Sequence, residues 1–300
     1  MSAVDRPIFF VGMPRSGTTI LFEAFARHPA LAWPTKYTDK APRLPWLNLA
    51  RVPLDRFGGR KAQYARRRVG NRFLPLPSEA YGFWNTVAAR NFGRSYLMRI
   101  PPDEDTKTRV SNAVAKIASW QFKPRFTAKL TGPARIGFLS AIFPDAKFIH
   151  VVRDGRAVVH SLLRVGFWRD KGGLTAPFWT DGPPLPALAE WERSDRDAGV
   201  LAAIQWRHVL ELARLEATRL PAAQYIEIRY EDFIANPVAE VQRLLAACDL
   251  EMSTTVESYI STGASLTNMN RKFRRDFSPD YLVQLSQQME PCLSRYGYCS

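Results

Sequence analysis

The chain has 300 residues, of which 46% are hydrophobic, and its 42 Lys and Arg outnumber 28 Asp and Glu, for a formal net charge of +14. This length and apolar content exclude an intrinsically disordered chain, while the charge favours anionic partners such as nucleotides, nucleic acid, acidic glycans or a lipid surface. Three cysteines without a C-x-x-C pair indicate neither a disulfide framework nor a zinc site. No apolar run is long enough to span a bilayer. We therefore expect a cytoplasmic protein with at most peripheral membrane contact.

Short apolar runs that alternate with helical patterns predict four buried strands, over residues 7–12, 125–130, 146–152 and 224–230. Because a helical pattern follows each run, we expect an α/β fold with a central, mainly parallel sheet flanked by helices. Ligands of such folds bind outside the carboxyl ends of the strands. We expect residues 1–300 to form one domain.

The first predicted strand leads into "GMPRSGTT", in which Gly12 and Gly17 have the spacing of a phosphate-binding loop. A turn from strand to helix presents consecutive N–H groups and the positive end of the helix to an anion, so the loop, with Thr18 and Thr19, suits a phosphate. The lysine of nucleoside triphosphatases is replaced here by Thr18. We expect Arg15, inside the loop, to supply the missing positive charge through its fixed fork of donors.

Two insertions, residues 31–123 and 166–186, interrupt the alternation of strands and helices. Insertions of this size usually shape a second-substrate site or a lid. Their aromatic residues suit sugars or amphipathic lipids, although plain core packing is the commoner role: Trp33, Tyr37, Trp46, Tyr81, Phe83, Trp84, Phe167, Trp168 and Trp179. The basic, Leu- and Pro-rich segment 42–76, whose part 51–72 has eight basic residues against Asp55 alone, suits either an anionic membrane or an ordinary solvated surface.

Arg153 follows the predicted strand at 146–152, and Ser161 lies eight residues later in the next helical pattern. Arginine suits a phosphate because its guanidinium donates two parallel hydrogen bonds, and Ser161, about two helical turns on, returns to a similar face of the helix. Taken alone, Arg153 is an unremarkable arginine at the end of a strand and Ser161 a small packing residue.

Together, "PRSGTT" at 14–19 and the Arg153 and Ser161 pair resemble the two signatures of sulfotransferases that use 3′-phosphoadenosine 5′-phosphosulfate (PAPS), especially the bacterial and tyrosylprotein-type branch. The resemblance implies a P-loop NTPase-like sulfotransferase fold with helical insertions, and in-line transfer of a sulfuryl group from PAPS, without a metal, to an acceptor hydroxyl or, less readily, an amine. It assigns Arg153 and Ser161 to the 3′-phosphate. It assigns the 5′-phosphosulfate to Arg15, Ser16, Gly17, Thr18 and Thr19.

Three further segments extend the resemblance. "KLTGP" has Lys129 at the end of its strand, where the family often has a lysine near the transferred group. "IRYEDFIANP" resembles the family's Tyr-Glu-Asp segment, whose tyrosine packs against adenine, and that residue is Tyr230 here. "NRKFRRDF" resembles the tail of the same branch, so Arg271 and Lys272 are expected to add to the 3′-phosphate site.

Sulfuryl transfer needs positive charge near the transferred group, expected from Arg15 and Lys129, and a proton acceptor. Thr131 stands where arylsulfotransferases carry a histidine, so the best remaining candidate for the base is Glu79. Ser78 suits the N-cap of a helix whose first turn then carries Glu79 beside shielding aromatic residues. The alternative makes Glu79 only a favourable acidic residue in that first turn.

Two other functions are compatible with parts of the sequence. A P-loop kinase or NTPase shares the fold class, and Asp154 follows a strand as a magnesium ligand would. A nucleic-acid-binding protein accounts for the net charge and interleaved aromatic residues, but it leaves the pairing of Arg153 and Ser161 with the loop unexplained. We therefore expect a sulfotransferase without a nucleic-acid partner; its acceptor, in our interpretation a carbohydrate, lipid or glycolipid, is not specified by the sequence.

Overall fold

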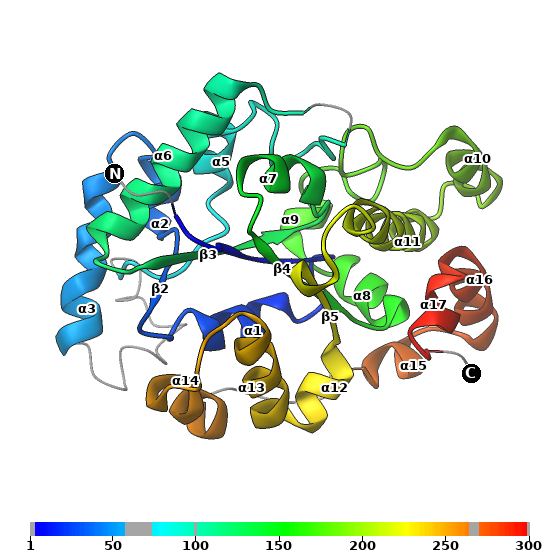
Figure 1. Cartoon of the computed structure of the whole chain (residues 1–300). Helices are drawn as coiled ribbons and strands as arrows, with labels where there is room; N and C mark the ends of the chain where they lie inside the picture. The colour runs from blue at the N-terminus through cyan, green and yellow to red at the C-terminus, as the bar shows by residue number, and fades with distance from the viewer. Residues whose placement is uncertain (1–3, 58–73, 99–100, 264–269, 299–300) are drawn as a thin grey trace.

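A parallel β-sheet forms the centre of the computed structural model, which describes residues 4–57, 74–98, 101–263 and 270–298 (Figure 1). The five strands of the described residues have the spatial order β2-β3-β1-β4-β5, and every pairing is parallel. Their bounds are β1 Ile8–Gly12, β2 Leu31–Ala32, β3 Arg125–Thr131, β4 Lys147–Val152 and β5 Tyr225–Arg229. The expected α/β fold is confirmed.

The four predicted strands match β1, β3, β4 and β5 to within one residue at each end. The fifth strand, β2, was not predicted. It occupies the first two positions of the expected insertion 31–123, where Leu31 pairs with Arg125 and Ala32 with Phe126. Two residues are too few to carry a periodic pattern, and only their pairing with β3 makes them a strand.

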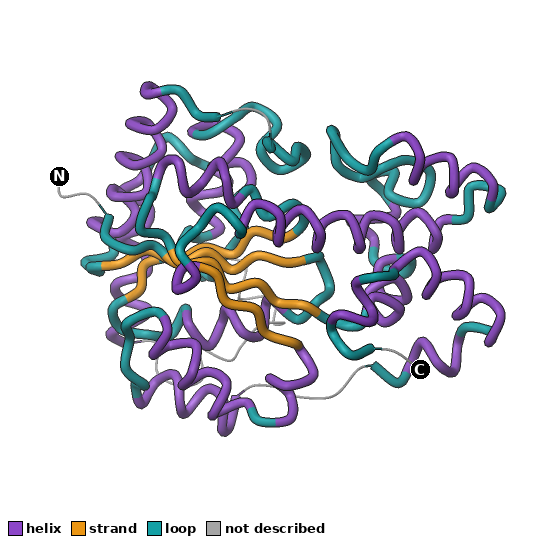
Figure 2. The backbone as a smooth tube through the Cα atoms, turned by 45° about the vertical axis from the view of Figure 1, so that its right-hand side comes forward, coloured by secondary structure: helices purple, strands orange, loops and turns teal. Residues whose placement is uncertain are grey.

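Helices cover both faces of the sheet, as Figure 2 shows in purple on either side of the orange strands. Those of the N-terminal half are α1 Thr18–Phe25, α2 Lys36–Lys40, η1 Pro45–Ala50, α3 Arg51–Phe57, α5 Tyr81–Val87, α6 Glu104–Trp120 and α7 Ile136–Ile142. The remaining helices are α8 Gly155–Leu162, α9 Gly166–Arg169, α10 Leu185–Arg193, α11 Ala198–Ala217, η3 Ala222–Gln224, α12 Tyr230–Ala235, α13 Pro237–Ala247, α14 Thr254–Ser258, η4 Tyr259–Gly263, α15 Lys272–Asp276, α16 Pro279–Met289 and α17 Cys292–Arg295. Within the described ranges, no helix combines the length and the apolar character that a membrane crossing requires.

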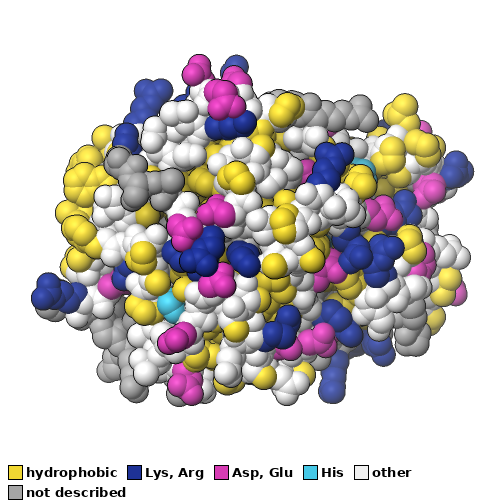
Figure 3. All heavy atoms as spheres, viewed as in Figure 1, with side chains coloured by type: hydrophobic (Ala, Val, Ile, Leu, Met, Phe, Trp, Pro, Cys, Tyr) yellow, Lys and Arg dark blue, Asp and Glu magenta, His cyan; other side chains and the backbone are white. Residues whose placement is uncertain are grey.

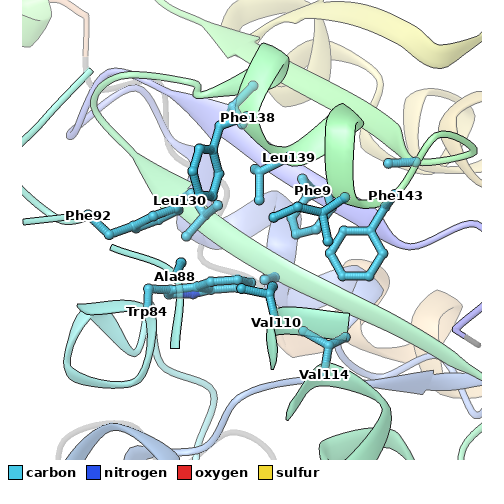
Figure 4. Packing of buried hydrophobic residues seen from close by; sticks show 14 of the residues in the cluster. Phe9, Trp84, Ala88, Phe92, Val110, Val114, Leu130, Phe138, Leu139 and Phe143 are labelled. Carbon is cyan, nitrogen blue, oxygen red and sulfur yellow. The ribbon is translucent and has the colours of Figure 1, made fainter. Parts of the chain in front are cut away.

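The strand β1 is buried on both sides, which explains its continuous apolar sequence. Phe9 faces α5, α6 and α7, and its ring packs against Trp84 at a centroid distance of 6.3 Å (Figure 4). It also packs against Phe148 at 5.6 Å. Phe10 points to the opposite face, where it contacts Phe25 of α1 at 4.8 Å. Burial of the strand in this way anchors the loop that follows Gly12.

Candidate active site

The loop between β1 and α1 is packed tightly around two glycines with positive φ angles. A Cβ atom at Gly12 (φ 148°) would lie 2.5 Å from the Val151 carbonyl oxygen, and one at Gly17 (φ 86°) would lie 2.3 Å from Cδ2 of Tyr230. The backbone therefore turns within a small space, and α1 begins at Thr18. This places the first N–H groups of the helix, which have no intrahelical partner, at the carboxyl edge of the sheet.

Two buried hydroxyl groups have no hydrogen-bond partner among the described residues: Ser16 Oγ of this loop and Thr18 Oγ1 of the first residue of α1. Ser16 is fully buried and Thr18 is 2% exposed. A buried hydroxyl without a partner is unfavourable, and the adjacent helix N-terminus favours negative charge. An anionic ligand on the loop would accept hydrogen bonds from both hydroxyls and would lie at the positive end of the helix. The loop therefore fits the phosphate end of the expected donor.

Arg15, Arg153, Ser161 and Tyr230 meet beside this loop, although they are far apart in the sequence. Arg15 Nε donates to Ser161 Oγ at 2.8 Å, and Arg153 Nη1 donates to the Arg15 carbonyl oxygen at 2.9 Å. The guanidinium of Arg153 lies over the ring of Tyr230, 4.6 Å from its centroid. Burial lowers the pKa of Arg153 from its ordinary value, although an arginine stays charged at neutral pH. The cluster is suited to bind phosphate groups.

Lys129, at the carboxyl end of β3, lies between the loop and Glu79. Its Nζ donates to Thr19 Oγ1 at 2.8 Å and forms an ion pair with Glu79 Oε1 at 2.9 Å. Glu79 Oε2 accepts a hydrogen bond from Thr131 Oγ1 at 3.1 Å. The side chains of Lys129 and Glu79 are 13% and 26% exposed. The structure therefore brings a cation, a carboxylate and the phosphate loop together, on residues separated by up to about 110 positions.

The expected helix capped by Ser78 is wrong. The helix α5 begins at Tyr81, and its N-cap is Ala80 in the left-handed conformation, with φ 51°. Ser78 Oγ accepts a hydrogen bond from Ala80 N at 3.1 Å and closes a turn that precedes the helix. Glu79 is therefore outside the first turn, which also removes its alternative role as a first-turn acidic residue. Its carboxylate is held by Lys129 and Thr131 instead.

A cavity of about 800 Å³ opens in front of the loop. Its walls come from the loop and the start of α1, from both insertions, from the end of β3, from the residue after β4 and from α12: Pro14, Arg15, Gly17, Thr18, Thr19, Ile20, Glu79, Tyr81, Asn85, Gly93, Arg94, Thr131, Arg153, Phe167, Lys171, Phe178, Trp179 and Tyr230. This volume is typical of a site for a small molecule or cofactor.

Three of the nine predicted aromatic residues line the cavity: Tyr81, Phe167 and Trp179. Four others belong to the buried core and are wrong as site residues: Trp33, Phe83, Trp84 and Trp168. Trp46 is 52% exposed, and neither it nor Tyr37 lines this cavity. Phe178, which the sequence reasoning missed, stacks on Trp168 at 4.5 Å and reaches the cavity. Core and site aromatic residues lie close together in the same insertions, as Phe167 and Trp168 do, so only the packing separates them.

Arg94 joins the two insertions and was also missed. Its Nη1 donates to the Phe178 carbonyl oxygen at 2.8 Å, its Nη2 donates to the Lys171 carbonyl oxygen at 3.3 Å, and its guanidinium lies 4.0 Å from the Phe178 ring centroid. Its own carbonyl oxygen accepts from Thr180 N at 2.7 Å. These contacts fix one wall of the cavity. A single arginine in a basic insertion carries no sequence signal of this role.

The C-terminal contribution to the cluster comes from Asn270. Asn270 Oδ1 accepts a hydrogen bond from Arg153 Nε at 2.8 Å. Arg271 and Lys272, the residues expected to add to this site, are exposed, and their side chains form no hydrogen bond or ion pair with the described residues. The only sequence signal for Asn270 is its position immediately before these two basic residues.

Asp154, which motivated the kinase alternative, has a local structural role. Its carboxylate caps α8 by accepting from Arg156 N at 3.0 Å, and it forms an ion pair with Arg156 Nη2 at 2.9 Å. Within the described part of the chain, no group of three or more His, Cys, Asp or Glu side chains is arranged to hold a metal ion.

Comparison with known proteins agrees with this geometry. Among curated proteins, the chain is 28% identical over 260 residues to the omega-hydroxy-beta-dihydromenaquinone-9 sulfotransferase Stf3 of Mycobacterium bovis. The matched region covers 80% of this chain and 62% of the relative. It is 21% identical to protein-tyrosine sulfotransferase 2 of Gallus gallus, over 98% of this chain and 70% of that protein. The chain thus spans less than two thirds of the mycobacterial relative's length.

A solved structure and a family model complete the comparison. The structure of sulfotransferase STF1 from Mycobacterium tuberculosis superposes on this chain with a TM-score of 0.57 at 18% sequence identity. The match covers 96% of this chain and 77% of STF1, so the two proteins have the same fold. The model of the sulfotransferase family matches residues 7–254, which include β1 to β5 and the whole cavity. The chain therefore belongs to the sulfotransferase family.

Proposed function

We propose that this chain transfers a sulfuryl group from PAPS to an acceptor hydroxyl. The observation that carries the proposal is the meeting of Arg15, Arg153, Ser161 and Lys129 around one loop with two unpartnered buried hydroxyls. Membership of the sulfotransferase family supports it independently. The alternative function, a P-loop NTPase, predicts a preference for ATP over PAP.

The donor would be held by two groups of residues. The loop from Arg15 to Thr19 would bind the 5′-phosphosulfate through its N–H groups and hydroxyls, while Arg153 and Ser161 would bind the 3′-phosphate, with Tyr230 against the adenine. When bound, PAPS supplies an activated sulfuryl group whose leaving phosphate oxygen gains negative charge. Arg15 and Lys129 would stabilise that charge in a partly buried site, where electrostatic interactions are stronger than in water.

The proton of the acceptor would pass to Glu79. The acceptor oxygen forms the new bond to sulfur, the bond from sulfur to the donor's phosphate oxygen breaks, and that oxygen keeps the electron pair. Glu79 lines the cavity next to Lys129, so a base and a cation lie together where the acceptor hydroxyl would enter. The product would be a sulfate ester together with 3′-phosphoadenosine 5′-phosphate.

The two insertions would form the acceptor side of a single domain. Tyr81, Phe167, Phe178 and Trp179 present aromatic surface to the cavity beside Arg94, which suits a carbohydrate, lipid or glycolipid more than a fully apolar molecule. Both curated relatives are named for hydroxyl-bearing acceptors, a hydroxylated menaquinone and a protein tyrosine. This supports a hydroxyl rather than an amine acceptor.

A lipid acceptor would be more accessible if the protein rests on a membrane. Leu44, Trp46 and Leu49 are 44%, 52% and 40% exposed on and beside η1, next to the exposed basic residue Arg43. Figure 3 shows hydrophobic side chains along the left edge of the molecule, where Figure 1 draws α3. Apolar and basic side chains together favour an anionic bilayer surface.

Sedimentation with anionic liposomes at low salt tests this contact. Trp46→Ala is expected to weaken sedimentation, whereas Leu185→Ala, which removes a side chain that is 81% exposed on α10, is expected to leave it unchanged. Equal sedimentation of wild type and Trp46→Ala, or none at all, would contradict membrane contact through this surface.

Calorimetric titration without metal tests the donor assignment. The ligands are 3′-phosphoadenosine 5′-phosphate (PAP), ATP and 5′-AMP, and the proteins are wild type and Arg153→Ala. We expect wild type to prefer PAP over 5′-AMP and the variant to lose that preference. A second ATP titration adds Mg²⁺. No binding of PAP, or binding of ATP that appears only in this second titration, would overturn the sulfotransferase assignment in favour of an NTPase.

A further inference from the structure

The guanidinium of Arg153 is fixed on three sides. Its Nε donates to Asn270 Oδ1 at 2.8 Å, its Nη1 donates to the Arg15 carbonyl oxygen at 2.9 Å, and its plane lies over the Tyr230 ring. A guanidinium has five N–H donors. The remaining N–H groups, which include both on Nη2, have no hydrogen-bond acceptor among the described residues. This end of the side chain is therefore available to donate hydrogen bonds to a ligand.

Asn270 is itself held in one orientation. Its Nδ2 donates to Glu231 Oε1, and its Oδ1 faces the donor Nε of Arg153. An amide flipped by 180° would place its NH₂ group against an N–H donor and its oxygen against a carboxylate, so only one orientation satisfies both contacts. Asn270 thus links the carboxylate of Glu231 to the guanidinium of Arg153, which do not contact each other directly.

Glu231 is fixed in turn by the C-terminal segment. Glu231 Oε2 accepts a hydrogen bond from Tyr298 Oη at 2.6 Å, and Oε1 also accepts from Asp154 N at 3.3 Å. Tyr298 is 6% exposed, and its carbonyl oxygen accepts from Arg156 Nη2 at 2.6 Å. Burial, together with the adjacent Glu231, raises the pKa of the Tyr298 phenol, which therefore remains a donor.

We propose that Asn270 is a positioning residue that, held by Glu231 and Tyr298, orients Arg153 for the 3′-phosphate of the donor and thereby sets the preference for a 3′-phosphorylated nucleotide. This inference rests on the proposed function. An arginine side chain has several rotatable bonds, so orienting it before binding reduces the entropy lost when the phosphate binds. Without Asn270, Nε would lose its acceptor and the guanidinium would sample other directions.

The test compares the affinities of PAP and 5′-AMP, which differ by the 3′-phosphate alone. We expect Asn270→Ala to weaken PAP binding on the order of tenfold, the effect of one hydrogen bond to a charged group, and to leave 5′-AMP binding unchanged. Asn112→Ala, the same substitution at an exposed site on α6, is the matched control and should change neither affinity. A general disturbance of the fold would weaken both ligands, so the ratio of the two affinities identifies positioning.

Three further variants make the result decisive. Glu231→Gln keeps an oxygen for Asn270 and should retain most of the preference for PAP, whereas Glu231→Ala should lose it. In an Arg153→Ala background, Asn270→Ala should have no additional effect, because Asn270 acts through Arg153.

The outcomes separate this inference from the proposed function. If wild type binds PAP no better than 5′-AMP, the 3′-phosphate site itself is absent and both proposals fail. If wild type prefers PAP and Asn270→Ala keeps the full preference, only the positioning role fails. Additive effects of Asn270→Ala and Arg153→Ala on PAP affinity would likewise overturn the positioning role of Asn270.

Discussion

Replacing Gly17 by alanine tests the packing of the phosphate loop. The position has φ 86°, and the new Cβ would lie 2.3 Å from Cδ2 and 2.8 Å from Cε2 of Tyr230, so the ring must move. The left-handed conformation alone costs an alanine about 1–2 kcal/mol. Displacing a buried ring adds strain typical of overpacking, about 1–3 kcal/mol, so we expect a total loss of about 2–5 kcal/mol in the free energy of unfolding.

Gly172 provides a matched control for the backbone strain. Its φ is 84°, nearly that of Gly17, but nothing lies within 4 Å of its ideal Cβ. Gly172→Ala should therefore lose only about 1–2 kcal/mol and should bind PAP normally. Gly17→Ala should lose more and should bind PAP at least tenfold more weakly, because the displaced Tyr230 no longer stacks under Arg153.

Denaturant unfolding and calorimetric titration with PAP measure the two effects. Equal destabilisation by Gly17→Ala and Gly172→Ala, combined with normal PAP binding by both, would refute the described packing of Tyr230 against the loop.

Further predictions concern the reacting groups and the pH dependence of stability. Arg15→Ala should abolish release of PAP in the presence of an acceptor while the unfolding midpoint stays near that of wild type; wild-type rates would contradict its role. Glu79→Gln should lower kcat about 10²–10⁴-fold and leave PAP affinity unchanged, whereas normal kcat would exclude Glu79 as the base. Burial lowers the pKa of His208 to about 4 from its ordinary 6.5, so stability is full above pH 6.5 and decreases as the pH falls towards about 4. The loss, on the order of 2 kcal/mol after allowance for partial exposure, should disappear from pH-dependent unfolding curves of His208→Gln; an unchanged curve would show that another group is responsible.

The local sequence determined the sheet and the positions of the segments that we propose bind the donor. Apolar runs buried on both faces have a clear pattern, so β1, β3, β4 and β5 were predicted to within one residue. The loop from Gly12 to Thr19, and the pair Arg153 and Ser161, are each contained in a short segment, and both segments were identified by their resemblance to the two signatures of the sulfotransferase family. The carboxyl ends of parallel strands lie at one edge, which is why these separate segments were expected to meet.

Tertiary structure decided the contacts between residues that are distant in the sequence. The edge strand β2 exists only through its pairing with β3. Glu79 precedes α5, and its carboxylate meets Lys129 across 50 positions of the chain. The role of Asn270 depends on a hydrogen bond to Arg153 across 117 positions. A single polar side chain has no periodicity or spacing of its own, so its partner is set by the packing of whole elements against one another.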